Sequence, residues 1–253
     1  MRPAIVFTML VLAAAPAAAQ TRPVPRRPAA ISDRVFVSID GVFQSTANDF
    51  SDSATFQKNA ETGSFSTKYN VQSGPAFNVA GGARLAPGFA VAVGVSRFSH
   101  STPTALTAAV PHPFFFNQPR TVNGDIVGVT RQELAVHVQA RGMIPLSDSL
   151  TAMLFAGPSF FQVKQDVVND FSYTDAYPYD TASFTQGVMT TAKKSKVGFN
   201  AGADVSYFFG RQVGVGGTVQ YARSTITLDS AGGGALDVKV GGFQAGGGVR
   251  LRF

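Results

Sequence analysis

The sequence of 253 residues contains no cysteine and no tryptophan, only three histidines, and 14% charged residues. Without cysteine there is no disulfide framework, no thiolate metal site, no cysteine nucleophile and no lipid-modified N-terminal cysteine. Three histidines are too few for a histidine-rich metal centre, so we expect neither a metal nor another cofactor. Soluble domains carry ~25% charged residues. The low charge therefore disfavours an ordinary soluble domain.

The first twenty residues are typical of an export signal. Arg2 supplies a positive charge, residues 4–15 are apolar, and residues 17–19 offer the small side chains at which a signal peptidase cleaves. The apolar run is shorter than the ~20 residues that a membrane-spanning helix needs, which makes a membrane anchor the less favoured alternative. We expect a signal peptide over residues 1–20 and a flexible lead-in, rich in Pro and Arg, over residues 21–33.

After residue 33, hydrophobic residues alternate with small or polar ones. In one such segment Val197, Phe199 and Val205 share one face, while Asn200 and Asp204 share the other. A period of two is that of a β-strand. The pattern predicts eight strands, at residues 34–44, 65–83, 89–99, 128–144, 150–163, 196–209, 213–228 and 238–253. Residues 150–163 are apolar on both faces, so the facing of this strand stays open.

The predicted strands are long, and their charged residues recur on the small face, where a water-soluble sandwich would place its core. Strands of soluble proteins average ~5–6 residues, whereas tilted membrane-spanning strands need ~9–11. A barrel with lipid outside and polar groups inside explains both features. Glycine and alanine on the inner face fit the narrow interior of eight strands.

Short and long connections alternate along the chain. The short ones are residues 85–88, 145–149 and 210–211, and the long ones are residues 46–63, 100–127, 164–195 and 229–235. In transmembrane barrels the short turns are periplasmic and the long loops extracellular. We also expect a girdle of aromatic residues at each rim, with Phe89, Tyr207 and Phe209 at one and Tyr69 and Tyr221 at the other.

The end of the chain resembles the C-terminal signal by which bacterial outer-membrane barrels are recognised for insertion. Gly248, Leu251 and Phe253 match this signal, and Gly246 departs from it because a larger polar residue is usual there. Residues 34–253 as a whole resemble the small outer-membrane β-barrel superfamily, with its OmpA-type and OmpW-type porin-like barrels. The resemblance implies an all-β, eight-stranded, antiparallel, up-and-down transmembrane barrel with short periplasmic turns and long extracellular loops. It also implies a place in the outer membrane of a Gram-negative bacterium and insertion by the barrel-assembly machinery.

Seven polar side chains are predicted to form a network in the lumen. They are Asp40, Lys68, Glu133, His137, Arg141, Asp204 and Arg250. One interpretation is a selective passage, and the other is a set of paired charges that fills the barrel. We favour the second, because side chains fill an eight-stranded interior and buried charges need partners. His137 lacks a second ligand at a suitable spacing, so we expect a hydrogen-bonded interior residue rather than a metal ligand or catalyst.

Aromatic residues also gather in two of the predicted loops. The recognition candidates are Phe114, Phe115, Phe116, Tyr173, Tyr177 and Tyr179. They could bind an extracellular ligand, or they could pack on one another to order long loops, and the sequence favours neither. Lys193, Lys194 and Lys196 could contact phosphates of lipopolysaccharide, although a solvated loop end is the commoner explanation.

No motif indicates an enzyme. Lipid A deacylases resemble this chain in size and fold, but they use a His-x-Ser pair, and neither His100 nor His137 is followed by serine two residues later. The net charge of +6 is spread along the strands and the lead-in, which argues against nucleic acid as a partner. We therefore predict a structural or surface-interaction barrel that could pass small solutes. The alternative is a narrow porin-like channel or transporter for small or apolar solutes, and a lipid-modifying enzyme is less favoured. The expected partners are outer-membrane lipid, lipopolysaccharide, the assembly machinery and an unidentified extracellular ligand.

Overall fold

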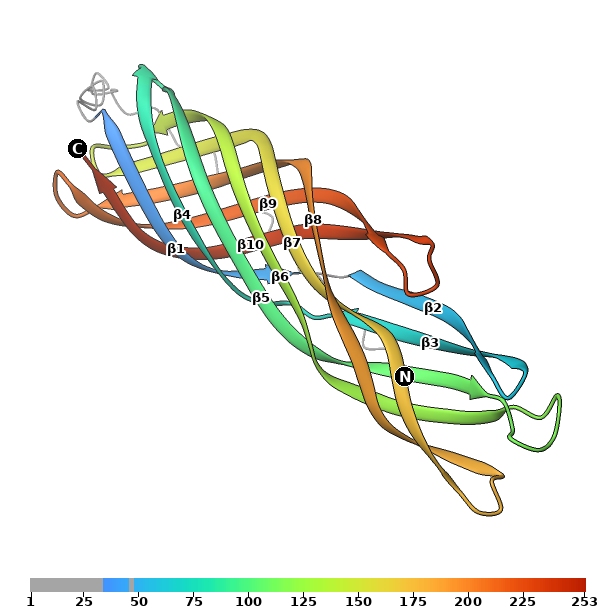
Figure 1. The fold of residues 1–253 in the computed structure, drawn as a ribbon. Coiled ribbons are helices and arrows are strands. Elements are labelled where there is room, and N and C mark those ends of the chain that lie inside the picture. Colours follow the sequence, from blue (N-terminus) through green and yellow to red (C-terminus); the bar gives the residue numbers. More distant parts are fainter. Residues whose placement is uncertain (1–33, 46–47) are drawn as a thin grey trace, which may run out of the picture.

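The computed structural model describes residues 34–45 and 48–253, and every regular element in them is a β-strand (Figure 1). The strands are β1 (Val35–Ser45), β2 (Asn48–Lys58), β3 (Glu61–Val71), β4 (Gly74–Ala86), β5 (Phe89–Val110), β6 (Arg120–Pro145), β7 (Leu150–Ala176), β8 (Thr181–Phe208), β9 (Val213–Asp229) and β10 (Ala235–Arg252). Within these ranges the chain forms no helix that could cross a membrane. The signal peptide and lead-in predicted for residues 1–33 lie outside the described residues.

Eight of the strands close into a barrel, in the order β1, β4, β5, β6, β7, β8, β9, β10, and β10 returns to pair with β1. Every neighbouring pair is antiparallel, which confirms the predicted eight-stranded, up-and-down topology. The remaining two strands, β2 and β3, form a hairpin between β1 and β4, and β3 pairs with the far half of β5. The N–H of Arg34 donates to the carbonyl of Phe253 at 2.7 Å, so both ends of the barrel chain meet at one rim.

Three of the four connections predicted to be long loops are largely strand. Residues 46–63 contain all of β2 and the start of β3, while β5 runs on to Val110 and β6 begins at Arg120. Likewise β7 runs to Ala176 and β8 begins at Thr181. Figure 1 shows these hairpins projecting far beyond one rim of the barrel. The loop prediction was wrong there because the alternation continues with its polarity exchanged, so that it no longer matches the pattern of a membrane strand.

Strand β9 shows this exchange of polarity most directly. In its first half Val215 and Val219 point outward and Gln220 points inward, whereas in its second half Thr227 points outward and Leu228 inward. Every second residue faces inward along the whole strand, but the apolar side chains lie on the outer face in the first half and on the inner face in the second. We call the part with an apolar outside the band, and the part with an apolar interior the extension.

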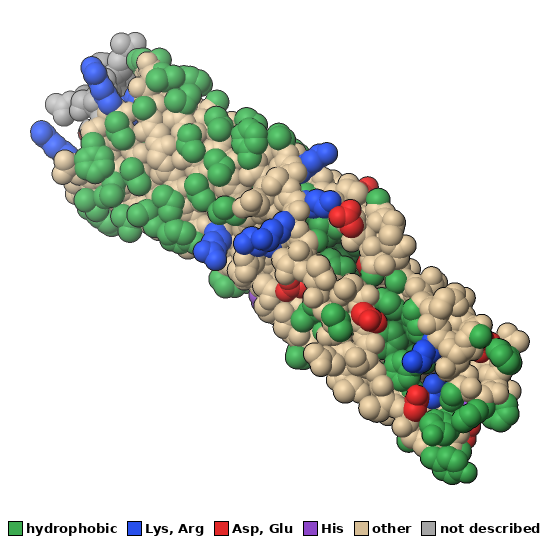
Figure 2. Space-filling model, viewed as in Figure 1, with side chains coloured by type: hydrophobic (Ala, Val, Ile, Leu, Met, Phe, Trp, Pro, Cys, Tyr) green, Lys and Arg blue, Asp and Glu red, His purple; other side chains and the backbone are tan. Residues whose placement is uncertain are grey.

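The outside of the band is bordered by aromatic side chains at both rims. The exposed rings at the rim next to the extension are Phe43, Phe77, Phe160, Phe199, Tyr221 and Phe243. The exposed rings at the opposite rim are Phe89, Tyr207, Phe209 and Phe253. Along β9 the rims are separated by the stretch from Val213 to Tyr221, which corresponds to a height of roughly 20 Å for a tilted strand. Figure 2 shows the hydrophobic side chains spread over this end of the molecule.

The extension contains a hydrophobic core like that of a water-soluble protein. Phe65, Leu106 and Val240 belong to one buried cluster there, as does Tyr69, which is 2% exposed. The hydroxyl of Tyr69 accepts the N–H of Val168 at 2.8 Å, and burial raises the pKa of this phenol. Tyr69 is thus an interior residue and not a member of the outer girdle.

The structure also corrects the position of Lys68. Its neighbours in β3 face the core, so Lys68 lies on the exposed outer face of the extension rather than in the lumen. The sequence prediction had assumed that the apolar face of this strand meets lipid. The pairing of β3 with the far half of β5 instead places it beyond the band, where the apolar face turns inward.

Candidate functional site

The interior of the band holds a compact set of charged groups. Three carboxylates (Asp40, Glu133 and Asp204) and three guanidinium groups (Arg131, Arg141 and Arg250) are all buried there. Their formal charges cancel, which reduces the cost of burying them. Five of the six were predicted from the sequence. Arg131 was missed, although its place two residues before Glu133 on the same strand puts it on the same face.

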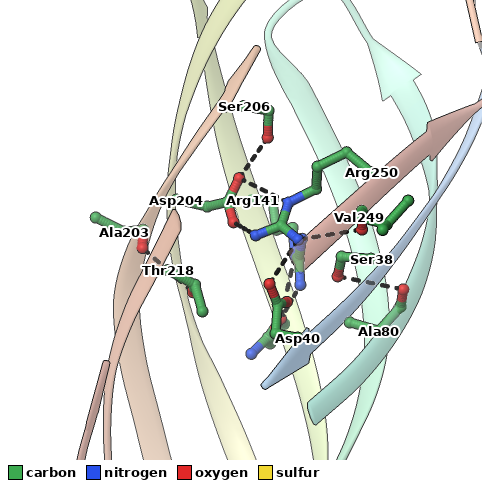
Figure 3. A network of polar contacts seen from close by, with 11 residues as sticks. Ser38, Asp40, Ala80, Arg141, Ala203, Asp204, Ser206, Thr218, Val249 and Arg250 are labelled. Atoms are coloured by element: carbon green, nitrogen blue, oxygen red, sulfur yellow. Dashed lines mark hydrogen bonds and ion pairs between the residues drawn. The ribbon is translucent and has the colours of Figure 1, made fainter. Parts of the chain in front are cut away.

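Arg250 is the centre of the first cluster (Figure 3). Its Nη1 donates to Oδ1 of Asp40 at 2.6 Å, and its Nη2 forms an ion pair with Asp204. The hydroxyl of Ser206 donates to Oδ1 of Asp204 at 2.6 Å. A Cβ at position 216 would come within 2.7 Å of the Arg250 Nε, so Gly216 makes room for the arginine. One guanidinium group therefore joins β10 to β1 and to β8.

Glu133 is the centre of a second cluster, where the polar interior meets the apolar core of the extension. Its carboxylate accepts hydrogen bonds from Arg131 Nε at 2.6 Å, from Gln44 Nε2 at 3.1 Å and from the N–H of Gly241 at 2.9 Å. Gln44 in turn accepts a bond from Gln244 Nε2 at 2.7 Å. Both oxygens of this carboxylate therefore accept hydrogen bonds from groups inside the barrel.

His137 is held by hydroxyl groups on both sides. Its Nε2 lies 2.9 Å from the Ser96 Oγ and its Nδ1 lies 2.7 Å from the Ser159 Oγ. The ring is buried, and Asn200 also donates to the Ser159 Oγ at 2.9 Å. Among the described residues, no group of three or more His, Asp or Glu could hold a metal ion. The arrangement is that of a packed polar interior.

Two small cavities lie inside the band, among the residues that the structure describes. Both are lined by Ser38 and Arg141 among others, and they measure about 30 and 20 Å³. Each is large enough for about one water molecule. Beyond the band, the hydrophobic core of the extension occupies the interior. Neither cavity has the size of a solute passage.

A second candidate site lies at the far end of the extension. We call residues 111–119, between β5 and β6, and residues 177–180, between β7 and β8, the tip. Arg120 forms an ion pair with Asp175 and donates to the carbonyl of Tyr179 at 3.1 Å and to that of Pro111 at 3.1 Å. The N–H of Asn117 donates to Oε1 of Glu61 at 2.7 Å, which ties the tip to β3. These contacts brace the tip from three hairpins.

The six aromatic recognition candidates divide into two groups. Phe114, Phe115 and Phe116 are 67%, 54% and 68% exposed, and Tyr177 is 88% exposed. Figure 2 shows hydrophobic side chains gathered at this end of the molecule. Tyr179 is half-buried and packs edge-on against Phe114, with ring centroids 5.4 Å apart. Half-buried Tyr173 lies outside the tip and packs on Phe171 in the extension, with ring centroids 5.9 Å apart. Some of these rings therefore pack on one another and order the hairpins, while others face solvent. Binding of a ligand by the exposed rings stays a prediction.

The three residues of the predicted insertion signal lie at the other end, where β10 pairs with β1. Phe253 is exposed at the rim, and its N–H donates to the carbonyl of Val35 at 2.8 Å. Leu251 is opposite Val37 and Gly248 opposite Asp40. A Cβ at Gly248 would come within 1.8 Å of the Ile39 carbonyl oxygen, so only glycine fits. Their role in insertion stays a prediction.

Comparison with known proteins finds similar structures only. No protein-family model and no curated protein sequence matches the chain. The outer membrane protein OprG from Pseudomonas aeruginosa aligns with a TM-score of 0.47 and 8% identity, over 87% of this chain and 96% of its own. Neisserial surface protein A aligns with a TM-score of 0.45 and 12% identity, over 87% and 97%. The outer membrane protease OmpT from Escherichia coli aligns with a TM-score of 0.45 and 9% identity, over 87% and 97%.

Proposed function

We propose that this chain is a closed barrel of the bacterial outer membrane that holds the tip outside the cell as a binding surface. The exchange of polarity along one continuous barrel carries the proposal. The band presents apolar side chains outward between two aromatic rims, as lipid requires, and the extension presents polar side chains outward around an apolar core, as water requires. The short turns and the chain end at Phe253 then face the periplasm.

The tip is suited to recognition because its aromatic rings are exposed on a braced support. Exposed apolar patches mark interaction sites, and large aromatic side chains contribute much of the binding energy at interfaces. The bonds of Arg120 hold the two hairpins together before any partner arrives. A preorganised surface loses less conformational entropy on binding.

The orientation can be tested with single cysteines, because the chain has none of its own. We expect Tyr177→Cys at the tip to react with a membrane-impermeant maleimide on intact cells. Ser147→Cys, in the exposed turn between β6 and β7, is the control and should react only after the cells are broken. Labelling of Ser147→Cys but not of Tyr177→Cys on intact cells would reverse the proposed orientation.

Binding by the tip predicts that polar replacements there reduce adhesion. Intact cells carrying the chain are presented with octyl-coated beads and with a printed glycan array. We expect retention on at least one surface to fall about tenfold when Phe114, Phe115 and Phe116 are all replaced by serine. Val127→Ser removes an equally exposed side chain from the flank of the extension and should have no effect. Equal retention of the triple variant and the unchanged chain would contradict a binding tip.

A narrow channel is the alternative function, and the filled interior argues against it. We expect the full chain to show no steady conductance in planar bilayers over a range of voltages, because the charged clusters and the hydrophobic core occupy the interior. A general porin inserted in the same bilayer serves as the positive control. Regular single-channel steps from the purified chain would favour the channel.

A further inference from the structure

Basic side chains form a belt around the outside of the barrel, where the apolar band ends and the extension begins. The belt consists of Arg97, Lys164, Lys193, Arg223 and Lys239, which lie on β5, β7, β8, β9 and β10. Its level is set by the aromatic rim, because Arg97 is opposite Phe77 and Arg223 is opposite Phe199. Figure 2 shows Lys and Arg side chains gathered at this border on the visible face.

A hollow of about 150 Å³ lies within the belt on the outer face of β5, β6 and β7. It is lined by Arg97, Gln132, Glu133, Leu134, Gln162 and Lys164. Arg97 is opposite Leu134, and Lys164 is opposite Gln132, so the two cations stand on either side of β6. Two strand spacings and a stagger of two residues along β6 separate their backbones by roughly 12 Å. A small anion between them could contact both.

The hollow carries a net positive charge, because its two cations outnumber the one nearby carboxylate, Asp166, that has no cationic partner among the described residues. The carboxylate of Glu133 is turned into the barrel, where it meets Arg131 and Gln44. The carboxylate of Asp166 accepts bonds from the N–H of Thr130 at 3.0 Å and from the Thr191 hydroxyl at 2.7 Å. In the part of the chain that the structure describes, neither Arg97 nor Lys164 forms an ion pair.

We infer that this hollow binds the phosphoryl group of an anionic lipid in the outer leaflet, namely the phosphorylated lipid A part of lipopolysaccharide. Arg97 and Lys164 contact the phosphate, and the amides of Gln132 and Gln162 donate further hydrogen bonds. The acyl chains lie on Leu134 and the apolar band below it. The inference rests on the proposed outer-membrane location, which sets the hollow at the height of lipid headgroups.

The test measures retention of lipid A by the full chain in detergent, with native mass spectrometry as the readout. We expect the double variant Arg97→Gln with Lys164→Gln to bind lipid A about 30-fold more weakly, the effect of two charges near an anionic surface. Dephosphorylated lipid A should bind equally weakly to both proteins. The control pairs Lys58→Gln with Arg211→Gln, which removes two exposed charges at the ends of the molecule and should leave binding unchanged.

Three results would overturn the inference. They are equal affinity of the double variant and the unchanged chain, equal affinity for lipid A with and without phosphate, and displacement of lipid A by inorganic phosphate at equal concentration. The last would identify a site for soluble anions. Heat-modifiable gel migration checks that each variant is folded. Spontaneous insertion into vesicles is measured separately, so a failure of the membrane location is distinguished from a failure of this site.

Discussion

Replacement of Arg250 by methionine is expected to destabilise the folded barrel by about 3–5 kcal/mol, the cost of leaving buried charges without their partner. Asp40 and Asp204 both bind this guanidinium group inside the band, and both are buried. Methionine fills a similar length but offers no charge, so the two carboxylates would lose the one group that binds both of them. The effect should exceed that of any single change on the surface of the extension.

Two further variants show whether charge pairing is the cause. Arg211→Met removes an exposed arginine from the turn between β8 and β9 and should change the stability by less than about 0.5 kcal/mol. The double variant Asp204→Asn, Arg250→Met should recover much of the lost stability, because the two carboxylates and two guanidinium groups that then remain buried balance in charge. Urea titration in lipid vesicles, followed by gel migration of the folded form, measures each value. A loss that the double variant does not recover would indicate packing rather than charge.

A lysine introduced at Val138 is expected to cost about 2–4 kcal/mol, whereas one at Thr121 should cost almost nothing. Both side chains point outward from β6, but Val138 lies within the band and Thr121 on the extension. The penalty at Val138 arises from transfer of a charge into hydrocarbon. The two variants place the same charged side chain on the outer face of the same strand, so they differ only in the surroundings of the lysine.

The comparison is informative only in a bilayer. Folding titrations of both variants in phosphatidylcholine vesicles should show the loss at Val138, and a water-soluble fold would show no such difference. Equal stability of the two lysine variants in vesicles would mean that the band does not meet lipid, and the proposed location would then be wrong.

The alternation of side chains was sufficient to predict the number of barrel strands, although residues 65–83, expected as one strand, form the end of β3 and most of β4. Residues 196–209 and 213–228 show why, since every second residue of a strand points to the same face whatever surrounds it. The inward position of Asp204 and Arg250 followed from the same local rule. The partner of each did not, because pairing depends on how neighbouring strands are aligned.

The sequence by itself determined the alternating segments that form the band and its polar interior. Only the tertiary structure decided which solvent each half of a strand meets. In β3 the apolar residues Phe65 and Tyr69 were expected to face lipid, but the pairing of β3 with β5 places them beyond the band, around a core of their own. An alternating strand is compatible with either arrangement, because alternation separates two faces without specifying the side on which water lies. Strand register and barrel closure specify that side, and both depend on residues far apart in the chain.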